Sequence, residues 1–153
     1  MRHIFSTYDR IIAILSGRTI ESIVLFVSRV ALAGIFWRSG RSKVEEESWL
    51  ELSDITLFLF ESEYAGVPLP TQFAAYTATY AEHLFPILLV FGLMTRFSAA
   101  ALLIMTLVIQ FFVFPEAWWS VHIVWTALAA ILLSRGPGLF SIDAGLRAVI
   151  HKP

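Results

Sequence analysis

The sequence predicts an all-α protein, namely a bundle of four transmembrane helices with short amphipathic helices at the membrane surface. The 153 residues are 58% hydrophobic and only 15% charged, whereas soluble domains are about 45–50% apolar and about 25% charged. The apolar residues gather in four long blocks, each close to the roughly 20 residues that a helix needs to cross a bilayer. No sizeable soluble domain fits beside these blocks, so we expect residues 1–153 to form a single integral membrane domain.

The composition also excludes several classes of protein. The chain has no cysteine, which rules out disulfide scaffolds, thiol redox relays, Cys-ligated zinc and iron–sulfur clusters. The net charge of −1 argues against nucleic-acid binding. Because the sequence also lacks a phosphate-binding glycine loop and a nucleophile elbow, we expect no self-contained catalytic site.

The four predicted spans cover residues 20–37, 71–92, 97–114 and 118–133. The third and fourth spans are hydrophobic enough to be recognised on their own. The second is more polar, because it carries Glu82 and His83, but the residues after His83 are strongly apolar. The first block is long, contains Arg29 in its middle and lacks an A-x-A cleavage site, so we expect it to remain in the mature chain rather than to act as a signal peptide.

The charges outside the spans predict the orientation. An even number of spans puts both termini on one side, which carries seven cations: Arg2, Arg10, Arg18, Arg96, Arg135, Arg147 and Lys152. On the other side, acidic residues outnumber the three cations Arg38, Arg41 and Lys43. By the positive-inside rule, both termini are expected to be cytoplasmic.

Three shorter segments predict helices that lie on the membrane surface. Asp9 to Leu15 has Asp9 as its expected N-cap, the loop after the first span contains a helix at residues 53–62 capped by Ser53, and Ser141 caps a final amphipathic helix.

Two charged residues are expected near the middle of the bilayer. Arg29 lies nine residues before Arg38, and Glu82 lies eleven residues after Thr71, which places them about 13 and about 16 Å from the outer end of their helices. Because an isolated charge there costs roughly 2.5–3.5 kcal/mol, we expect Arg29 and Glu82 to form a buried ion pair. This pair either only fixes the register of the two helices or also lines a binding cavity.

Pro86 follows Glu82 and His83 by one helical turn. Proline frees the carbonyl four residues earlier, that of Glu82, and is expected to bend the helix. A free carbonyl, a carboxylate and an imidazole would then form a polar patch suited to a small molecule or to protons. The bend is alternatively explained by packing alone.

Further candidate residues lie in the outer half of the bundle. Gln110 and His122 are expected about 6–7 Å from the outer end, while Trp125 and Tyr76 are candidates for stacking on a ring. This distribution favours a cavity open to the outer face, although single polar residues near a helix end are often plain interfacial groups. His83 is expected about 18 Å deep and His122 about 6 Å, which argues against haem ligation by both. No metal site is predicted.

Several strings resemble the DoxX family of small four-helix membrane proteins. They are RVALAGIFWRSGRSK, AEHLFPILLVFGLMTRFSAAAL, MTLVIQFFVFPEAWWSVHIVW and RGPGLFSID, and LSDITLFLFESEYAGVPLP resembles the outer loop of one branch. The likeness covers about residues 29–143. It implies a multi-pass protein of the bacterial inner membrane, in a family where some members are subunits of a thiosulfate:quinone oxidoreductase and others associate with redox-stress or metal-linked gene products. The family-like positions are Arg29, Gly40, Lys43, Glu82, Arg96, Gln110, His122 and Asp143.

These observations lead us to predict a membrane subunit of an oxidoreductase system that sits in the lipid bilayer with a partner protein and binds quinone or a similar amphiphile between its helices. Arg29 and His122 would donate hydrogen bonds to the ligand, and Glu82 with His83 would relay protons. Two alternatives stay open, a transporter of a small solute or metal that uses the same residues and a non-catalytic scaffold for a partner enzyme. Small residues such as Ala31 and Gly34 also permit a homo-oligomer.

Overall fold

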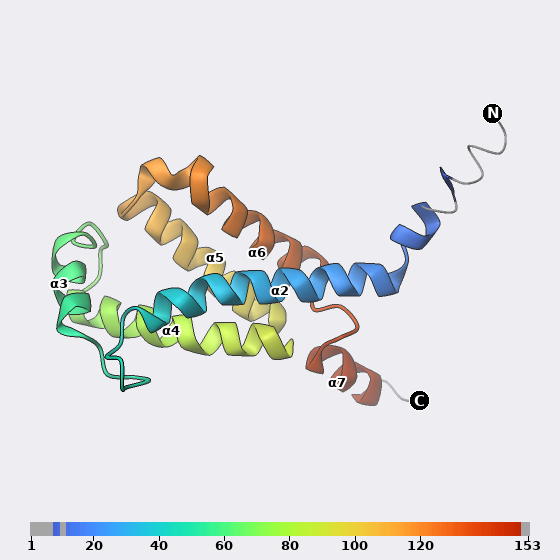
Figure 1. Ribbon diagram of the computed structural model, residues 1–153, viewed down its shortest axis with the longest axis horizontal. Helices are drawn as coiled ribbons and strands as arrows, with labels where there is room; N and C mark the ends of the chain where they lie inside the picture. Colours follow the sequence, from blue (N-terminus) through green and yellow to red (C-terminus); the bar gives the residue numbers. More distant parts are fainter. Residues whose placement is uncertain (1–7, 10–11, 151–153) are drawn as a thin grey trace.

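The computed structural model describes residues 8–9 and 12–150, and this part of the chain is built from helices (Figure 1). Its main elements are α2 (Arg18–Arg41), α3 (Asp54–Ser62), α4 (Thr71–Phe91), α5 (Thr95–Phe112), α6 (Ile123–Arg135) and α7 (Ile142–Ile150). A 3₁₀ turn (Pro115–Ala117) and a π-helical turn (Trp118–His122) lead from α5 into α6. The described residues contain no strand, only an isolated bridge between Val44 and Leu52, so the all-α prediction is confirmed.

Four long helices pack as a closed ring. Helix α2 contacts α4 and α6, and α5 contacts the same two helices from the other side. Helix α3 packs on α4 at one end of the ring, which we call the loop end, and α7 lies at the opposite end, which we call the terminal end (Figure 1). The start of α2 and the end of α6 meet at the terminal end, where Glu21 and Arg135 form an ion pair of 3.3 Å.

The interior of the ring is apolar, and so is much of its outer surface. All four helices contribute buried residues to one core cluster: Leu25, Leu32, Ala33, Phe36, Leu89, Ala99, Leu102, Ala129 and Leu132. The same helices expose large apolar side chains, among them Val27, Leu84, Ile104, Phe111 and Val124. An exposed apolar surface of this extent is unfavourable in water and is expected where helices face lipid.

Among the residues that the structure describes, three helical segments are long and apolar enough to cross a membrane: Arg18–Arg41, Thr95–Phe112 and Pro115–Arg135. The first and third of these segments contain the first and fourth predicted spans, and Thr95–Phe112 covers the third predicted span except for its last two residues. Helix α4 has 21 residues but is not one of the three, because its first half carries polar side chains such as Gln72 and Thr77. The helices thus indicate a multi-pass membrane protein.

Two of the three predicted caps of the surface helices are confirmed. Ser53 Oγ accepts a hydrogen bond from the amide of Thr56 at 3.2 Å, and α3 begins at the next residue. Ser141 Oγ likewise accepts from the amide of Ala144 at 3.1 Å, directly before α7. The helix predicted at Asp9 to Leu15 falls partly outside the described residues. Residues 8–9 and 12–15 are described and helical, so Asp9 lies within helical backbone and is not the N-cap that was expected.

Arg29 ties the elements of the terminal end together. Its side chain is fully buried, and Nη2 donates a hydrogen bond to the carbonyl of Phe140, in the segment before α7. Nearby, the carboxylate of Asp143 accepts hydrogen bonds from the amides of Met94 and Thr95, both at 2.9 Å, and so caps α5. The amide of Asp143 donates to the carbonyl of Gly92 at 2.9 Å. Helix α7 is therefore attached to α2 and to the turn between α4 and α5.

We predict that Gly92→Ala destabilises the protein. Gly92 ends α4 with a φ of 66°, and a Cβ there would collide with Nη1 of the buried Arg29. The left-handed backbone costs an alanine about 1–2 kcal/mol, and the overlap adds about 1–3 kcal/mol, so the Tm in detergent should fall clearly. Gly34→Ala is the control, because no atom lies within 4 Å of a Cβ at that position in α2. Equal Tm values for the two variants would contradict this account of the terminal end.

Candidate functional site

The predicted ion pair between Arg29 and Glu82 is wrong. Helices α2 and α4 run antiparallel, with Gly40 of α2 beside Glu82 and Arg29 of α2 beside Gly92. Eleven residues of α2 and ten of α4 separate these two levels, which is about 15 Å along the helix axes. Arg29 therefore belongs to the terminal end and Glu82 to the loop end of the ring.

The error came from the reference points used to estimate depth. Helix α2 continues to Arg41, past the predicted end of the first span at residue 37. Since Gly40 in the last turn of α2 lies beside Glu82, the residues of α4 before Glu82 extend beyond the end of α2, where they pack against α3. Thr71 consequently does not mark the depth that Arg38 marks, and Glu82 lies nearer to the loop end than predicted.

Glu82 forms its ion pair with Lys43 instead. The two side chains are 12% and 2% exposed, and the distance between Lys43 Nζ and Glu82 Oε2 is 2.7 Å. Lys43 Nζ also donates to Ser39 Oγ at 2.8 Å and to the Ser39 carbonyl at 3.3 Å. A buried pair is tolerated only where further hydrogen bonds satisfy the charged groups, and Ser39 meets that need for the ammonium group.

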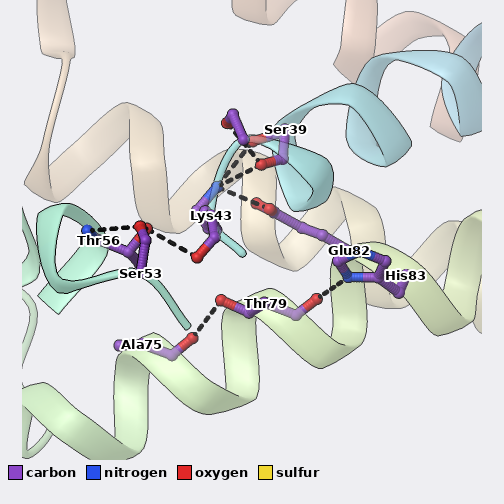
Figure 2. A network of polar contacts seen from close by, with 9 residues as sticks. Ser39, Lys43, Ser53, Thr56, Ala75, Thr79, Glu82 and His83 are labelled. Carbon is purple, nitrogen blue, oxygen red and sulfur yellow. Dashed lines mark hydrogen bonds and ion pairs between the residues drawn. The ribbon is translucent and has the colours of Figure 1, made fainter. Parts of the chain in front are cut away.

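The backbone around Lys43 is held by the start of α3 (Figure 2). The carbonyl of Lys43 accepts hydrogen bonds from the amide of Ser53 at 3.1 Å and from Thr56 Oγ1 at 2.9 Å. On the other side, the amide of Lys43 donates to the carbonyl of Gly40 at 3.0 Å and so closes the end of α2. These bonds fix Lys43 between α2 and α3, from where its side chain reaches α4.

Gly40 allows α2 and α4 to approach closely enough for this pair to form. A Cβ on Gly40 would lie 3.0 Å from ring atoms of His83 and 3.1 Å from the Cβ of Glu82. His83 Nδ1 donates to the carbonyl of Thr79 at 2.7 Å, and the ring packs edge-on against Trp37 with centroids 5.2 Å apart. The imidazole is thus used for packing between the two helices, and its Nε2 is buried without a hydrogen-bond partner.

An apolar cavity of about 350 Å³ begins at the Lys43–Glu82 pair and runs between α4 and α5. Its walls are formed by Phe60 of α3, by Tyr64, Val67 and Leu69, and mainly by small or aliphatic side chains of α4 and α5. Ile104, which also lines the cavity, is 62% exposed on the outer surface of α5. The cavity therefore opens sideways, toward the surface that we assign to lipid, and ends at an ionic group.

Tyr64 is the aromatic wall of this cavity at the loop end. Its ring stacks on Phe60, with centroids 4.3 Å apart and planes 13° from parallel. Burial raises the pKa of Tyr64, and the nearby carboxylates of Glu82 and Glu63 raise it further. Since both effects favour the neutral phenol, Tyr64 keeps its proton at neutral pH and can donate a hydrogen bond.

Of the seven predicted site residues, Glu82 is the one that lines this cavity. Arg29 lies at the terminal end, and His83 lies between α2 and α4. Tyr76 is 43% exposed and packs beside Tyr80 on the outside of α4. The structure therefore separates residues that the sequence had placed in one pocket.

Gln110, His122 and Trp125 form a second cluster at the loop end. His122 Nδ1 donates to Gln110 Oε1 at 2.7 Å, and Gln110 Nε2 donates to the carbonyl of Pro115 at 2.7 Å. The His122 ring lies 5.1 Å from Trp125, which meets Phe36 of α2 edge-on at 5.4 Å. The prediction that Gln110 and His122 lie at similar depth is confirmed. Within the part of the chain that the structure describes, no three His, Cys, Asp or Glu side chains are grouped to hold a metal ion.

Sequence reasoning missed Lys43 and Tyr64 as partners of the site. Lys43 had been counted as a loop cation, although it is the first charged residue after α2 and one of the family-like positions. No pattern in the sequence shows that residues 42–53 turn back and direct Lys43 toward α4. Tyr64 carries no sequence signal, because only the packing of residues 64–69 against α4 brings it to the cavity.

The fold and the cavity define a helical membrane protein with a laterally open apolar pocket that ends at a buried ion pair. The chain belongs to the DoxX family, whose family model matches residues 24–115, and the resemblance seen in the sequence is confirmed. An uncharacterized protein of Haemophilus influenzae is 29% identical over 145 aligned residues, which cover 84% of this chain and 87% of that protein. No solved structure gives a significant match.

We predict strong coupling between Lys43 and Glu82. Removing one partner leaves the other charge buried, so Lys43→Met and Glu82→Met should each lower the free energy of unfolding by about 3–5 kcal/mol. The double variant should lose less than the more damaging single variant, because an apolar pair of similar volume often replaces a buried ion pair without loss. Chemical unfolding in mixed micelles measures all three variants.

Arg135→Gln is the control for this cycle. It removes the exposed pair with Glu21, in which Arg135 is 70% exposed, and should cost less than about 1 kcal/mol. Additive effects of the two methionine substitutions would contradict the ion pair described above.

Proposed function

We propose that this DoxX-family protein is the membrane subunit of an oxidoreductase system and that it binds quinone, or a similar amphiphile, in the cavity between α4 and α5. The observation that carries the proposal is the shape and chemistry of this cavity. It is apolar over most of its length, it ends at Lys43 and Glu82, and it is open at Ile104 on the lipid side. A ligand with a polar head and an apolar tail matches each of these features.

The volume of the cavity agrees with such a ligand. At about 350 Å³ it lies within the range of roughly 300–1,000 Å³ typical of small-molecule sites. A quinone ring is small enough to fit in this volume, and its isoprenoid tail would leave the cavity between α4 and α5 toward the acyl chains. Burial of the ring among apolar side chains supplies most of the affinity.

Two donors and one proton-holding group are in place for the head of the ligand. The Tyr64 phenol is a neutral donor beside the ion pair. Lys43 Nζ binds the Ser39 carbonyl at 3.3 Å, the longest of its three hydrogen bonds, and a ligand oxygen would replace that bond at the lowest cost. Glu82 is the carboxylate at the cavity wall: it would accept a proton from the ligand on oxidation and, once protonated, would return a proton to the ligand on reduction.

The transporter alternative loses the site on which it was based, because Arg29 and Glu82 lie at opposite ends of the ring. The cavity between α4 and α5 is also closed at the ion pair by α3 and Lys43, whose backbone is bonded to Ser53 and Thr56. These contacts favour a binding site over a passage across the bundle.

We further propose that α4 also crosses the membrane, as the second of four spans, and that the terminal end is cytoplasmic, in the inner membrane of a bacterium. Helix α4 packs beside α2 and α5 over its apolar second half, and cations gather at the terminal end, where Arg18, Arg96 and Arg135 lie. The positive-inside rule then places this end in the cytoplasm.

Cysteine labelling tests this topology. Because the chain has no native cysteine, any labelling of a variant comes from the introduced cysteine. In intact spheroplasts, an impermeant maleimide should label Ser48→Cys in the loop after α2. It should label Met94→Cys and Gly145→Cys only after lysis. Labelling of Met94→Cys together with Ser48→Cys in intact cells would show that α4 does not cross the membrane.

Filling the cavity should remove the bound ligand. Ala81 lines it, and Ala81→Phe places a ring in the space that the ligand would occupy. We expect the wild-type protein, reconstituted in lipid that contains ubiquinone and menaquinone, to retain quinone through purification and Ala81→Phe to retain almost none. Chromatography of organic extracts measures the retained amount.

Tyr64→Phe should weaken binding roughly 2- to 10-fold, since it removes one hydrogen bond.

Ala130→Phe is the matched control, because Ala130 is exposed on α6, away from this cavity. It should retain quinone like the wild type. Equal retention by Ala81→Phe and Ala130→Phe would overturn the assignment of the ligand to this cavity.

The oxidoreductase role is tested with the intact system. Affinity isolation of the protein from cross-linked membranes should yield a partner whose absorption spectrum shows a redox cofactor, and quinone reduction by this complex should fail with Ala81→Phe. A complex that reduces quinone equally well with both phenylalanine variants would leave this chain with a scaffold role only.

A further inference from the structure

A second cavity, unrelated to the quinone site, lies at the terminal end of the ring. It has a volume of about 430 Å³ and is bounded by the start of α2, the segment after α6 and one face of α7. Unlike the cavity at the loop end, it is lined by charged side chains. Arg18 comes from α2, Arg135 is the last residue of α6, and Arg147 lies in α7.

The charge of this cleft is positive. Three guanidinium groups line it, and Glu21, bonded to Arg135 at 3.3 Å, is the acidic residue in its wall. Guanidinium groups from three separate elements in one cleft favour the binding of an anion. Guanidinium groups bind phosphate with paired, charge-assisted hydrogen bonds, so phosphate is the anion best suited to them.

The surroundings of the cleft are those of a membrane surface. In α7, the side that lines the cleft carries Ala144, Arg147 and Ala148, whereas an exposed apolar stripe runs along the rest of the helix. This stripe consists of Ile142, Leu146, Val149 and Ile150, whose spacing of four, three and one residues places them on one face. A helix with this pattern lies in the interface with its apolar side toward acyl chains.

The apolar stripe continues onto the neighbouring elements. Leu139 and Phe140 before α7 are 47% and 53% exposed, and Ile23 and Val24 near the cleft on α2 are 45% and 53% exposed. A molecule whose phosphate is bound by the arginines therefore has apolar surface beside it for at least one hydrocarbon chain. A soluble phosphate compound would leave this surface unused.

We propose that the cleft between α2, the end of α6 and α7 is a binding site for the phosphate of an anionic phospholipid. The lipid joins α7 to the bundle, with Arg18 and Arg147 holding its head group and the stripe of α7 resting among its chains. Arg135 completes the site from the end of α6 and is oriented by Glu21. The site is independent of the quinone cavity, from which it is separated by the length of the ring.

Native mass spectrometry of the purified full chain in neutral detergent tests the proposal. Phosphatidylglycerol is titrated against the wild type, Arg18→Gln, Arg147→Gln and the control Arg38→Gln, with phosphatidylcholine as the zwitterionic comparison. Arg38 is an exposed arginine at the loop end of α2. We expect each of the two cleft variants to weaken phosphatidylglycerol binding about fivefold, while Arg38→Gln changes it little and phosphatidylcholine binds weakly to all four proteins.

Two controls separate the possible outcomes. The Tm of each variant is measured first, so that a misfolded protein is not read as a loss of binding, and Arg135 is left unchanged because its removal would also unpair Glu21. Inorganic phosphate and glycerol phosphate are then added as competitors. Displacement of the lipid by millimolar phosphate, or equal loss of binding in Arg38→Gln and Arg147→Gln, would overturn the proposal.

Discussion

The arrangement at the loop end depends on the buried ion pair between Lys43 and Glu82. Placing both charges away from water is costly, so the surrounding chain is arranged to satisfy them. Ser39 binds the ammonium group, the start of α3 holds the backbone of Lys43, and Gly40 lets α2 approach α4. Because the pair lies at the wall between bundle and loop, it also forms the polar end of the cavity. One interaction therefore links the packing of the helices to the chemistry of the pocket.

The class of fold could be read from the sequence, because lipid demands long apolar helices whatever their neighbours are. The caps at Ser53 and Ser141 and the depth shared by Gln110 and His122 follow from local patterns of the same kind. The partner of Glu82 could not be read in this way. It depends on how far α4 extends past α2 and on a turn that brings Lys43 back, and both are properties of tertiary packing.

The buried charged side chains at the two ends of the ring have different kinds of hydrogen-bond partner. At the loop end Glu82 has an ionic partner, whereas at the terminal end the buried Arg29 binds a backbone carbonyl, with Asp143 nearby as the cap of α5. The first solution leaves a charged group beside an open cavity. The second is enclosed by Gly92 and the segment before α7, which gives Arg29 a role in joining elements rather than in ligand chemistry.

One side of helix α3 is exposed, and the other side forms part of the cavity wall. Phe58 and Ile55 are exposed on it, while Phe60 forms part of the cavity wall and Thr56 holds the carbonyl of Lys43. Ser53 and Thr56, at the start of this nine-residue helix, both donate a hydrogen bond to the carbonyl of Lys43. A displacement of α3 would therefore change the position of Lys43 and, with it, the polar end of the cavity.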